Sequence, residues 1–169
     1  MADPLGRRSL PRGGALGLLL SGLRALLAAC APGPGTVRVE DRSMEPTLVP
    51  RELVTVRPAA TVRYGDVIAF AYPFPAPERS RHVLISRVIG LPGDRIEIVA
   101  GRVLRNGAPL DEPYVRNRSD RSFPPVIVPP GHYYVLGDDR TNQRDSRYWG
   151  PLPADKLLGV VALDRPSRP

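Results

Sequence analysis

The sequence has a single cysteine, Cys30, and a single lysine, Lys156, among its 169 residues. One cysteine cannot form a disulfide within the chain, so the fold must be held by its hydrophobic core. Because lysine is so scarce, the net charge of +7 is carried almost entirely by arginine. Helix-turn-helix, zinc-finger and aromatic RNA-binding patterns are missing, and no long helical periodicity appears after residue 36. These absences argue against a disulfide-rich domain, a nucleic-acid-binding protein and a helical bundle.

Short apolar runs separated by glycine and proline fill the chain after residue 36. Hydrophobic residues make up 42% of the sequence, which is enough for a packed core, and the 21 prolines and 16 glycines suit a loop-rich β protein. The runs of strand length are 53–56, 67–72, 83–89, 96–99, 103–104, 133–136 and 157–163. Turn residues on both sides of 102–105 predict a tight hairpin. The segments 74–81 and 117–130 predict surface loops. We therefore expect a mostly β fold with antiparallel sheets around one core.

The first 32 residues combine a basic N-terminus with an apolar stretch. Three arginines lie in residues 1–13, and residues 14–32 are largely apolar apart from Arg24. A membrane-spanning helix needs about 20 residues, and Arg24 is close enough to one end to extend toward the interface. The excess of arginine places the N-terminus in the cytoplasm. We predict a basic cytoplasmic segment at 1–13, a membrane anchor at 14–32, a linker at 33–36 and an extracytoplasmic domain at 37–169.

A cleavable signal peptide is the alternative for the same segment. The sequence Leu-Ala-Ala-Cys at 27–30 resembles a lipoprotein box, in which the cysteine becomes the lipidated N-terminus. The simpler interpretation is that Cys30 is a small apolar residue at the membrane edge. If Cys30 is lipidated, the attached lipid would hold the protein at the membrane in place of a membrane-spanning helix.

Five segments of the predicted exported part carry motifs. They are Arg-Ser-Met-Glu-Pro-Thr-Leu at 42–48, Tyr-Gly-Asp-Val-Ile at 64–68, Arg-Val-Ile-Gly-Leu-Pro-Gly-Asp at 87–94, Asn-Gly-Ala-Pro-Leu-Asp-Glu-Pro-Tyr at 106–114, and Gly-Asp-Asp-Arg through Tyr-Trp-Gly at 137–150. Each alone is weak, but their order and spacing resemble the bacterial type I signal peptidases (leader peptidases), serine proteases with a Ser/Lys dyad. The resemblance implies signal-peptidase-type antiparallel sheets with a groove, acyl-transfer chemistry, and no cofactor or metal.

Within this resemblance, Ser43 corresponds to the nucleophile. A serine hydroxyl needs a neighbouring base, and the family uses a lysine immediately before the segment that begins at Arg87. That position is Ser86 here. Arg87 cannot replace the lysine because arginine stays protonated, and His82 is about 13 Å away along an extended strand. We expect Ser43 and Ser86 to lie beside each other at the groove.

Two further positions differ from the family pattern. Family members often have a serine two residues before the nucleophile, which helps to hold the oxyanion; this chain has Asp41, whose charge would oppose that role. The serine that hydrogen-bonds the lysine is replaced by Gln143. Asp145 and Arg147, an ion pair that supports the site in the family, are retained.

The resemblance leaves two functions open. The first is a serine endopeptidase that removes signal peptides from exported preproteins, slowly or with an unusual base. The second is a catalytically inactive relative that binds preproteins or a membrane partner. A lipid-anchored binding protein, made through Cys30, is a remoter third. The expected partners are signal peptides and membrane lipids, with no nucleic acid, and the expected location is the bacterial cytoplasmic membrane.

Overall fold

The computed structural model describes residues 35–73, 83–141 and 144–163. Contacts divide the chain into two units, residues 1–30 and 31–169, and all described residues belong to the second. The predicted anchor at 14–32 and Cys30 lie outside the described residues. Within the described part, no helix is long and apolar enough to cross a membrane.

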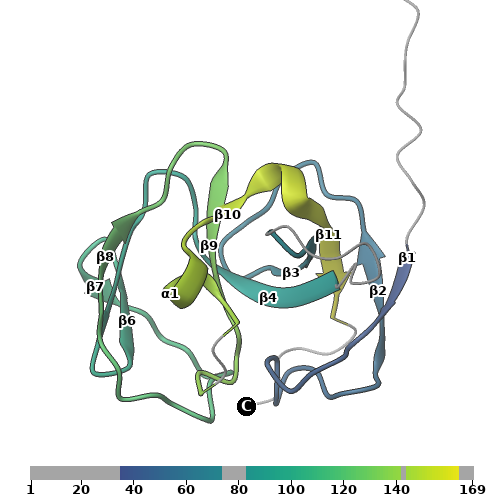
Figure 1. Cartoon of the computed structure of the whole chain (residues 1–169), viewed down its shortest axis with the longest axis horizontal. Helices are drawn as coiled ribbons and strands as arrows, with labels where there is room; N and C mark the ends of the chain where they lie inside the picture. Colours follow the sequence, from purple (N-terminus) through teal and green to yellow (C-terminus); the bar gives the residue numbers. More distant parts are fainter. Residues whose placement is uncertain (1–34, 74–82, 142–143, 164–169) are drawn as a thin grey trace, which may run out of the picture. The chain divides into compact units, whose positions relative to one another are not determined.

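A seven-stranded antiparallel sheet forms the larger half of the described fold (Figure 1). Its strand order is β1-β2-β11-β3-β4-β9-β10. The strands are β1 (Gly35–Arg38), β2 (Leu53–Arg57), β3 (Val67–Ala71), β4 (Val83–Gly90), β9 (His132–Leu136), β10 (Leu152–Pro153) and β11 (Leu157–Ala162). Two short helices, α1 (Ser146–Trp149) and η1 (Ala154–Lys156), lie between β9 and β11 in the sequence.

A four-stranded antiparallel sheet has the order β7-β6-β5-β8. Its strands are β5 (Arg95–Val99), β6 (Arg102–Arg105), β7 (Ala108–Pro109) and β8 (Phe123–Ile127). The β5–β6 turn has positive φ at both Ala100 (45°) and Gly101 (76°), as a two-residue hairpin turn requires. A Cβ on Gly101 would lie 1.6 Å from the carbonyl oxygen of Ser119, so only glycine fits there.

The two central strands β3 and β4 are buried on both faces because alternate residues enter different core clusters. Val67 and Ala69 of β3 pack in one cluster with Met44 and Leu48. Ile68 of β3 packs in another cluster, with residues of β4, β9 and β10. A third cluster fills the four-stranded sheet and its contact with β4 and β9. The segment 42–48, which contains Ser43, is therefore attached to the core through its own apolar side chains, Met44 and Leu48.

The mostly β prediction is confirmed, as is the hairpin around 102–105. Each of the seven predicted apolar runs coincides with a strand. The loop prediction for 117–130 was wrong at its centre, because β8 lies there. β8 contains Pro124 and Pro125, which read as a loop in the sequence, but it is an edge strand, where proline is tolerated. The predicted loop at 74–81 lies outside the described residues.

Candidate active site

Ser43 lies in a turn between β1 and β2 that is anchored by apolar side chains. Met44 is fully buried and Leu48 is 3% exposed, and both pack in the core cluster that includes Val67. The backbone N–H of Leu48 donates to the carbonyl of Met44 at 2.9 Å. Because the residues around it are fixed in the core, Ser43 is held half-buried at the surface of the domain.

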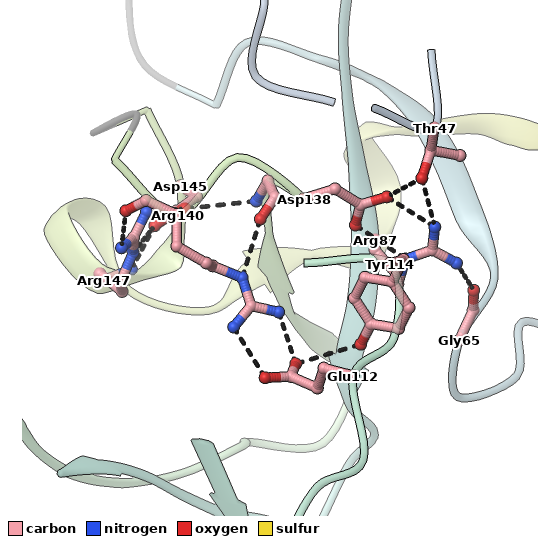
Figure 2. Close-up of polar contacts among 10 residues, drawn as sticks. Thr47, Gly65, Arg87, Glu112, Tyr114, Asp138, Arg140, Asp145 and Arg147 are labelled. Carbon is pink, nitrogen blue, oxygen red and sulfur yellow. Dashed lines mark hydrogen bonds and ion pairs between the residues drawn. The ribbon is translucent and has the colours of Figure 1, made fainter. Parts of the chain in front are cut away.

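The same turn is fastened to the segment that follows β9. The N–H of Asp139 donates to the carbonyl of Ser43 at 2.9 Å. The hydroxyl of Thr47 donates to the buried carboxylate of Asp138 (Figure 2). A Cβ on Gly137 would lie 2.7 Å from the carbonyl oxygen of Ser43, so the two backbones touch. Motifs about 90 residues apart in sequence are thereby brought into direct contact.

Arg87 and Asp138 form a buried, bidentate ion pair behind this contact. Arg87 donates to Asp138 from Nε at 2.8 Å and from Nη2 at 2.6 Å, and also to the carbonyl of Gly65 at 2.9 Å. The ring of Tyr114 stacks under the guanidinium, 4.0 Å from its carbon. Burial disfavours the charge on Arg87, but hydrogen bonds and attraction to Asp138 outweigh it and raise the pKa of Arg87. Arg87 is therefore a fixed cation and cannot accept a proton.

A second buried pair joins Arg140 to Glu112. The guanidinium donates to the carboxylate at 3.0 and 2.5 Å, and its Nε donates to the carbonyl of Gly137 at 2.9 Å. The hydroxyl of Tyr114 donates to Glu112 at 3.1 Å, which links the two pairs (Figure 2). Burial lowers the pKa of Arg140, but its hydrogen bonds and its attraction to Glu112 raise it. The net effect is a raised pKa. Sequence reasoning treated these residues only as parts of motifs. The available signal was Arg87, which lies within the apolar run 83–89, since a buried charge must be paired.

Asp145 and Arg147 lie on the other side of the same segment. Arg147 donates to Asp145 at 2.8 and 2.6 Å, and both side chains are 3% exposed. Asp145 caps α1 and accepts the N–H of Gly137 at 3.3 Å, while Arg147 donates to the carbonyl of Arg140 at 2.6 Å. The two predicted support residues thus contact the segment that holds Ser43.

A cleft of about 180 Å³ opens beside Ser43. Its lining residues are Val39, Glu40, Asp41, Ser43, Met44, Val83, Leu84, Ile85 and Arg144. Among these described lining residues there is no lysine or histidine. The carboxylate Oδ1 of Asp41 accepts the backbone N–H of Ser43 at 2.9 Å. The cleft therefore holds the predicted nucleophile together with two carboxylates, Glu40 and Asp41, of which Asp41 already accepts the N–H of Ser43.

Ser86 lies next to Ile85 on β4 and is 3% exposed. It pairs with Ile68 of β3 and is not among the residues that line the cleft. Lys156 belongs to η1, where its amine is 3.5 Å from Asp155, and it does not line the cleft either. Gln143 and His82 lie outside the described residues. No group of residues suited to a metal ion occurs in the described part of the chain.

Comparisons with known proteins identify relatives of this chain. A family model described as "Signal peptidase, peptidase S26" matches residues 16–164. The signal peptidase I of Leptolyngbya laminosa is 37% identical over 74% of this chain and 65% of that protein. The probable signal peptidase I-2 of Synechocystis sp. is 36% identical over 84% of this chain and 65% of that protein. The chain thus spans just under two thirds of the length of these relatives.

A solved structure is also similar. The crystal structure of a signal peptidase I from Enterococcus faecalis V583 superposes with a TM-score of 0.51 at 30% identity. The match covers 60% of this chain and 97% of that chain. The antiparallel sheets described above are therefore shared with a protein of this kind.

Proposed function

Because this chain belongs to the signal peptidase family, peptidase S26, we propose that it binds the signal-peptide segment of exported preproteins in the cleft beside Ser43. The family is a family of serine endopeptidases, so the chemistry at issue is attack by Ser43 on a peptide carbonyl. The segment before Ser43 and the first half of β4 would hold the peptide between them.

The observation that carries this proposal is the open edge of β4 at the cleft. β4 pairs with β3 from Val83 to Arg87, but with β9 only from Arg87 onward. In the strand ladders of the described residues, Val83–Ser86 therefore have a backbone partner on one side only. Val83, Leu84 and Ile85 line the cleft. An extended peptide can add to such an edge through backbone hydrogen bonds, with its side chains entering pockets.

The size of the cleft supports a restricted class of peptide. A volume of about 180 Å³ with apolar walls from Val39, Met44 and Ile85 has room for one or two side chains of a peptide. Glu40, Asp41 and Arg144 add polar groups to the lining. A short extended segment with apolar side chains near Ser43 is the ligand that this lining favours, and the family resemblance implies that those side chains are small.

Cleavage is proposed to be very slow or absent. Ser43 needs a base, and the family's lysine position is Ser86. The N–H of Ser43 already donates to Asp41, so it cannot also donate to an oxyanion while that contact stands. Binding without cleavage, rather than turnover with an unusual base, is the activity that these two features favour.

Membrane association and an extracytoplasmic domain complete the proposal. The predicted anchor at 14–32 would place the cleft near the outer surface of the cytoplasmic membrane, where exported preproteins emerge. The net charge of +7 would add attraction to anionic headgroups.

The test uses the full chain in detergent micelles with a labelled preprotein. We expect binding of the preprotein, no binding of the same protein without its signal peptide, and little or no cleavage. The Ser43→Ala variant should bind with similar affinity, since the hydroxyl is not needed to hold the peptide. Failure of the preprotein to bind would overturn the proposal. Rapid cleavage that Ser43→Ala abolishes would overturn the proposed lack of turnover and show that another base acts.

A further inference from the structure

A second groove, of about 460 Å³, is lined in part by the turn that carries Ser43. Its lining residues are Glu45, Pro46, Val49, Arg116 and Asn117. Val49 is 50% exposed, and Arg116 and Asn117 are exposed too. The groove shares no lining residue with the cleft beside Ser43. It is a separate surface built on the same turn.

Both walls of this groove are fixed relative to Ser43. The carbonyl of Asn117 accepts the N–H of Arg140 at 3.0 Å, and its side-chain amide donates to Asp139 at 3.2 Å. Asp139 in turn donates its N–H to the carbonyl of Ser43. The opposite wall, 45–49, is the continuation of the Ser43 turn itself. The groove therefore keeps its position with respect to Ser43.

The order of residues along the turn gives the path of a bound peptide. Residues up to Met44 on this turn line the first cleft, and the residues that follow, Glu45, Pro46 and Val49, line the groove. Met44 and Leu48 of the same turn pack in the core and fix it in place. A peptide whose scissile bond lies at Ser43 and whose signal side occupies the first cleft continues, on the other side of that bond, toward the groove.

The charge of the groove indicates which side chains suit it. The carboxylate of Glu45 is held by the guanidinium of Arg42 at 3.1–3.2 Å, so its charge is largely balanced. Arg116 supplies a cation to the lining. A guanidinium has five N–H donors, so Arg116 can bind a ligand carboxylate in addition to its contacts within the protein.

We propose that this groove binds the first residues of the mature part of the preprotein, and that Arg116 gives it a preference for acidic side chains there. The inference rests on the proposed function, because it requires a signal peptide in the first cleft. It adds a second recognition site, on the mature side of the scissile bond.

The experiment compares three labelled peptides by fluorescence anisotropy against the full chain in micelles, all in the Ser43→Ala background. One peptide ends at the cleavage position. The other two extend beyond it by four residues and carry either glutamate or lysine in the extension. We expect the glutamate peptide to bind about two- to fivefold more tightly than the lysine peptide, as an exposed ion pair allows. Arg116→Glu should reverse that order.

Two further variants distinguish binding in this groove from an effect of the protein's net charge. Arg63→Glu makes the same charge change at an exposed position that lines neither surface, and it should keep the wild-type order. Val49→Trp should occupy part of the groove and weaken both extended peptides while leaving the signal-only peptide unchanged.

The outcomes are distinguishable. Equal binding of the glutamate and lysine peptides, unchanged by Arg116→Glu, overturns the mature-side groove even if the signal-only peptide binds. An equal response to Arg63→Glu also overturns it, because net charge would then explain the preference. If no peptide binds at all, the proposed function fails and this inference fails with it.

Discussion

Asp41 and Ser43 are joined by a hydrogen bond in which the Oδ1 atom of Asp41 accepts the backbone N–H of Ser43 at 2.9 Å. An aspartate that accepts from the residue two positions on is a common way to stabilise a turn. Here the same contact occupies the N–H of the predicted nucleophile, which is a natural donor to an oxyanion. Asp41 thus stabilises the turn, and in the proposed role of Ser43 as nucleophile this contact would leave one donor fewer for the transition state.

The first prediction concerns catalysis. Ser86→Lys should produce measurable preprotein cleavage where the wild type has little or none, because it returns an amine to the position before Arg87. Loss of the base from a serine-protease site lowers kcat by about 10⁶, with about 10³–10⁴ over water remaining. Adding Asp41→Ser and Gln143→Ser should increase the rate further and non-additively, since residues that act together are coupled.

The control for this series is Ser43→Ala in each background, which should remove the gained activity. Cleavage is followed by gel or mass spectrometry of the released mature protein. If the triple variant folds and binds peptide but does not cleave, the correspondence between Ser86 and the family's lysine is wrong.

The second prediction concerns Gly137. A Cβ there would lie 2.7 Å from the carbonyl oxygen of Ser43, so Gly137→Ala must displace one backbone or the other. We expect a loss of about 1–3 kcal/mol in the free energy of unfolding, typical of overpacking, together with weaker peptide binding. Gly35→Ala is the matched control, because a Cβ there meets nothing within 4 Å. Equal behaviour of the two variants in thermal unfolding and binding would contradict the contact.

The third prediction concerns the buried pair of Arg87 and Asp138. Asp138→Asn removes the charge that balances Arg87 and should reduce the free energy of unfolding by about 3–5 kcal/mol. Glu97→Gln removes the partner of Arg95 in a more exposed pair, in which the side chain of Arg95 is 45% exposed and that of Glu97 is 28% exposed. This variant should change the free energy of unfolding by less than about 1 kcal/mol. Urea unfolding measures both. Similar losses in the two variants would mean that burial of the Asp138 pair does not matter.

The fourth prediction concerns alkaline pH. Burial first, and the nearby charge of Glu112 second, raise the pKa of Tyr114 above its ordinary value. A group whose pKa is higher in the folded state stabilises the fold. Its full contribution is present below the pKa of the unfolded state, about 10 for tyrosine. That contribution is lost as the pH rises further. Tyr114→Phe should cost about 1 kcal/mol at neutral pH, through the lost bond to Glu112.

Above pH 10 the same variant should lose less stability per pH unit than the wild type. The slope should not vanish, because burial also raises the pKa of Tyr134. Unfolding midpoints measured from pH 8 to pH 11 test this. Parallel curves for wild type and Tyr114→Phe would show that Tyr114 is not the titrating group.

The fifth prediction concerns residues 14–32. We expect the full chain to be found in the membrane fraction and to resist carbonate extraction, with its domain accessible to protease from outside. Mass spectrometry of an N-terminus at Cys30 bearing diacylglycerol would replace the anchor with the lipoprotein interpretation.

Much of the fold could be predicted from local composition. Runs such as 67–72 and 83–89 are rich in β-branched and aromatic residues, and strands formed there. The hairpin followed from Gly101, which tolerates positive φ, whereas the positive φ of Ala100 had no signal in the sequence. β8 was missed because Pro124 and Pro125 resemble loop residues until their position at a sheet edge is known. The bond between Asp41 and Ser43 had a local signal, since an Asp two positions before a backbone donor is typical of such turns.

The sequence by itself determined the family motifs and the absence of a lysine before Arg87. Only the tertiary structure decided which distant charges meet. Arg87 and Asp138 are 51 residues apart, and Arg140 and Glu112 are 28 apart. No local pattern specifies these pairings, because they depend on how strands from separate hairpins align. The open edge of β4 was likewise decided by where β9 ends beside it, and strand alignment is a property of the assembled sheet.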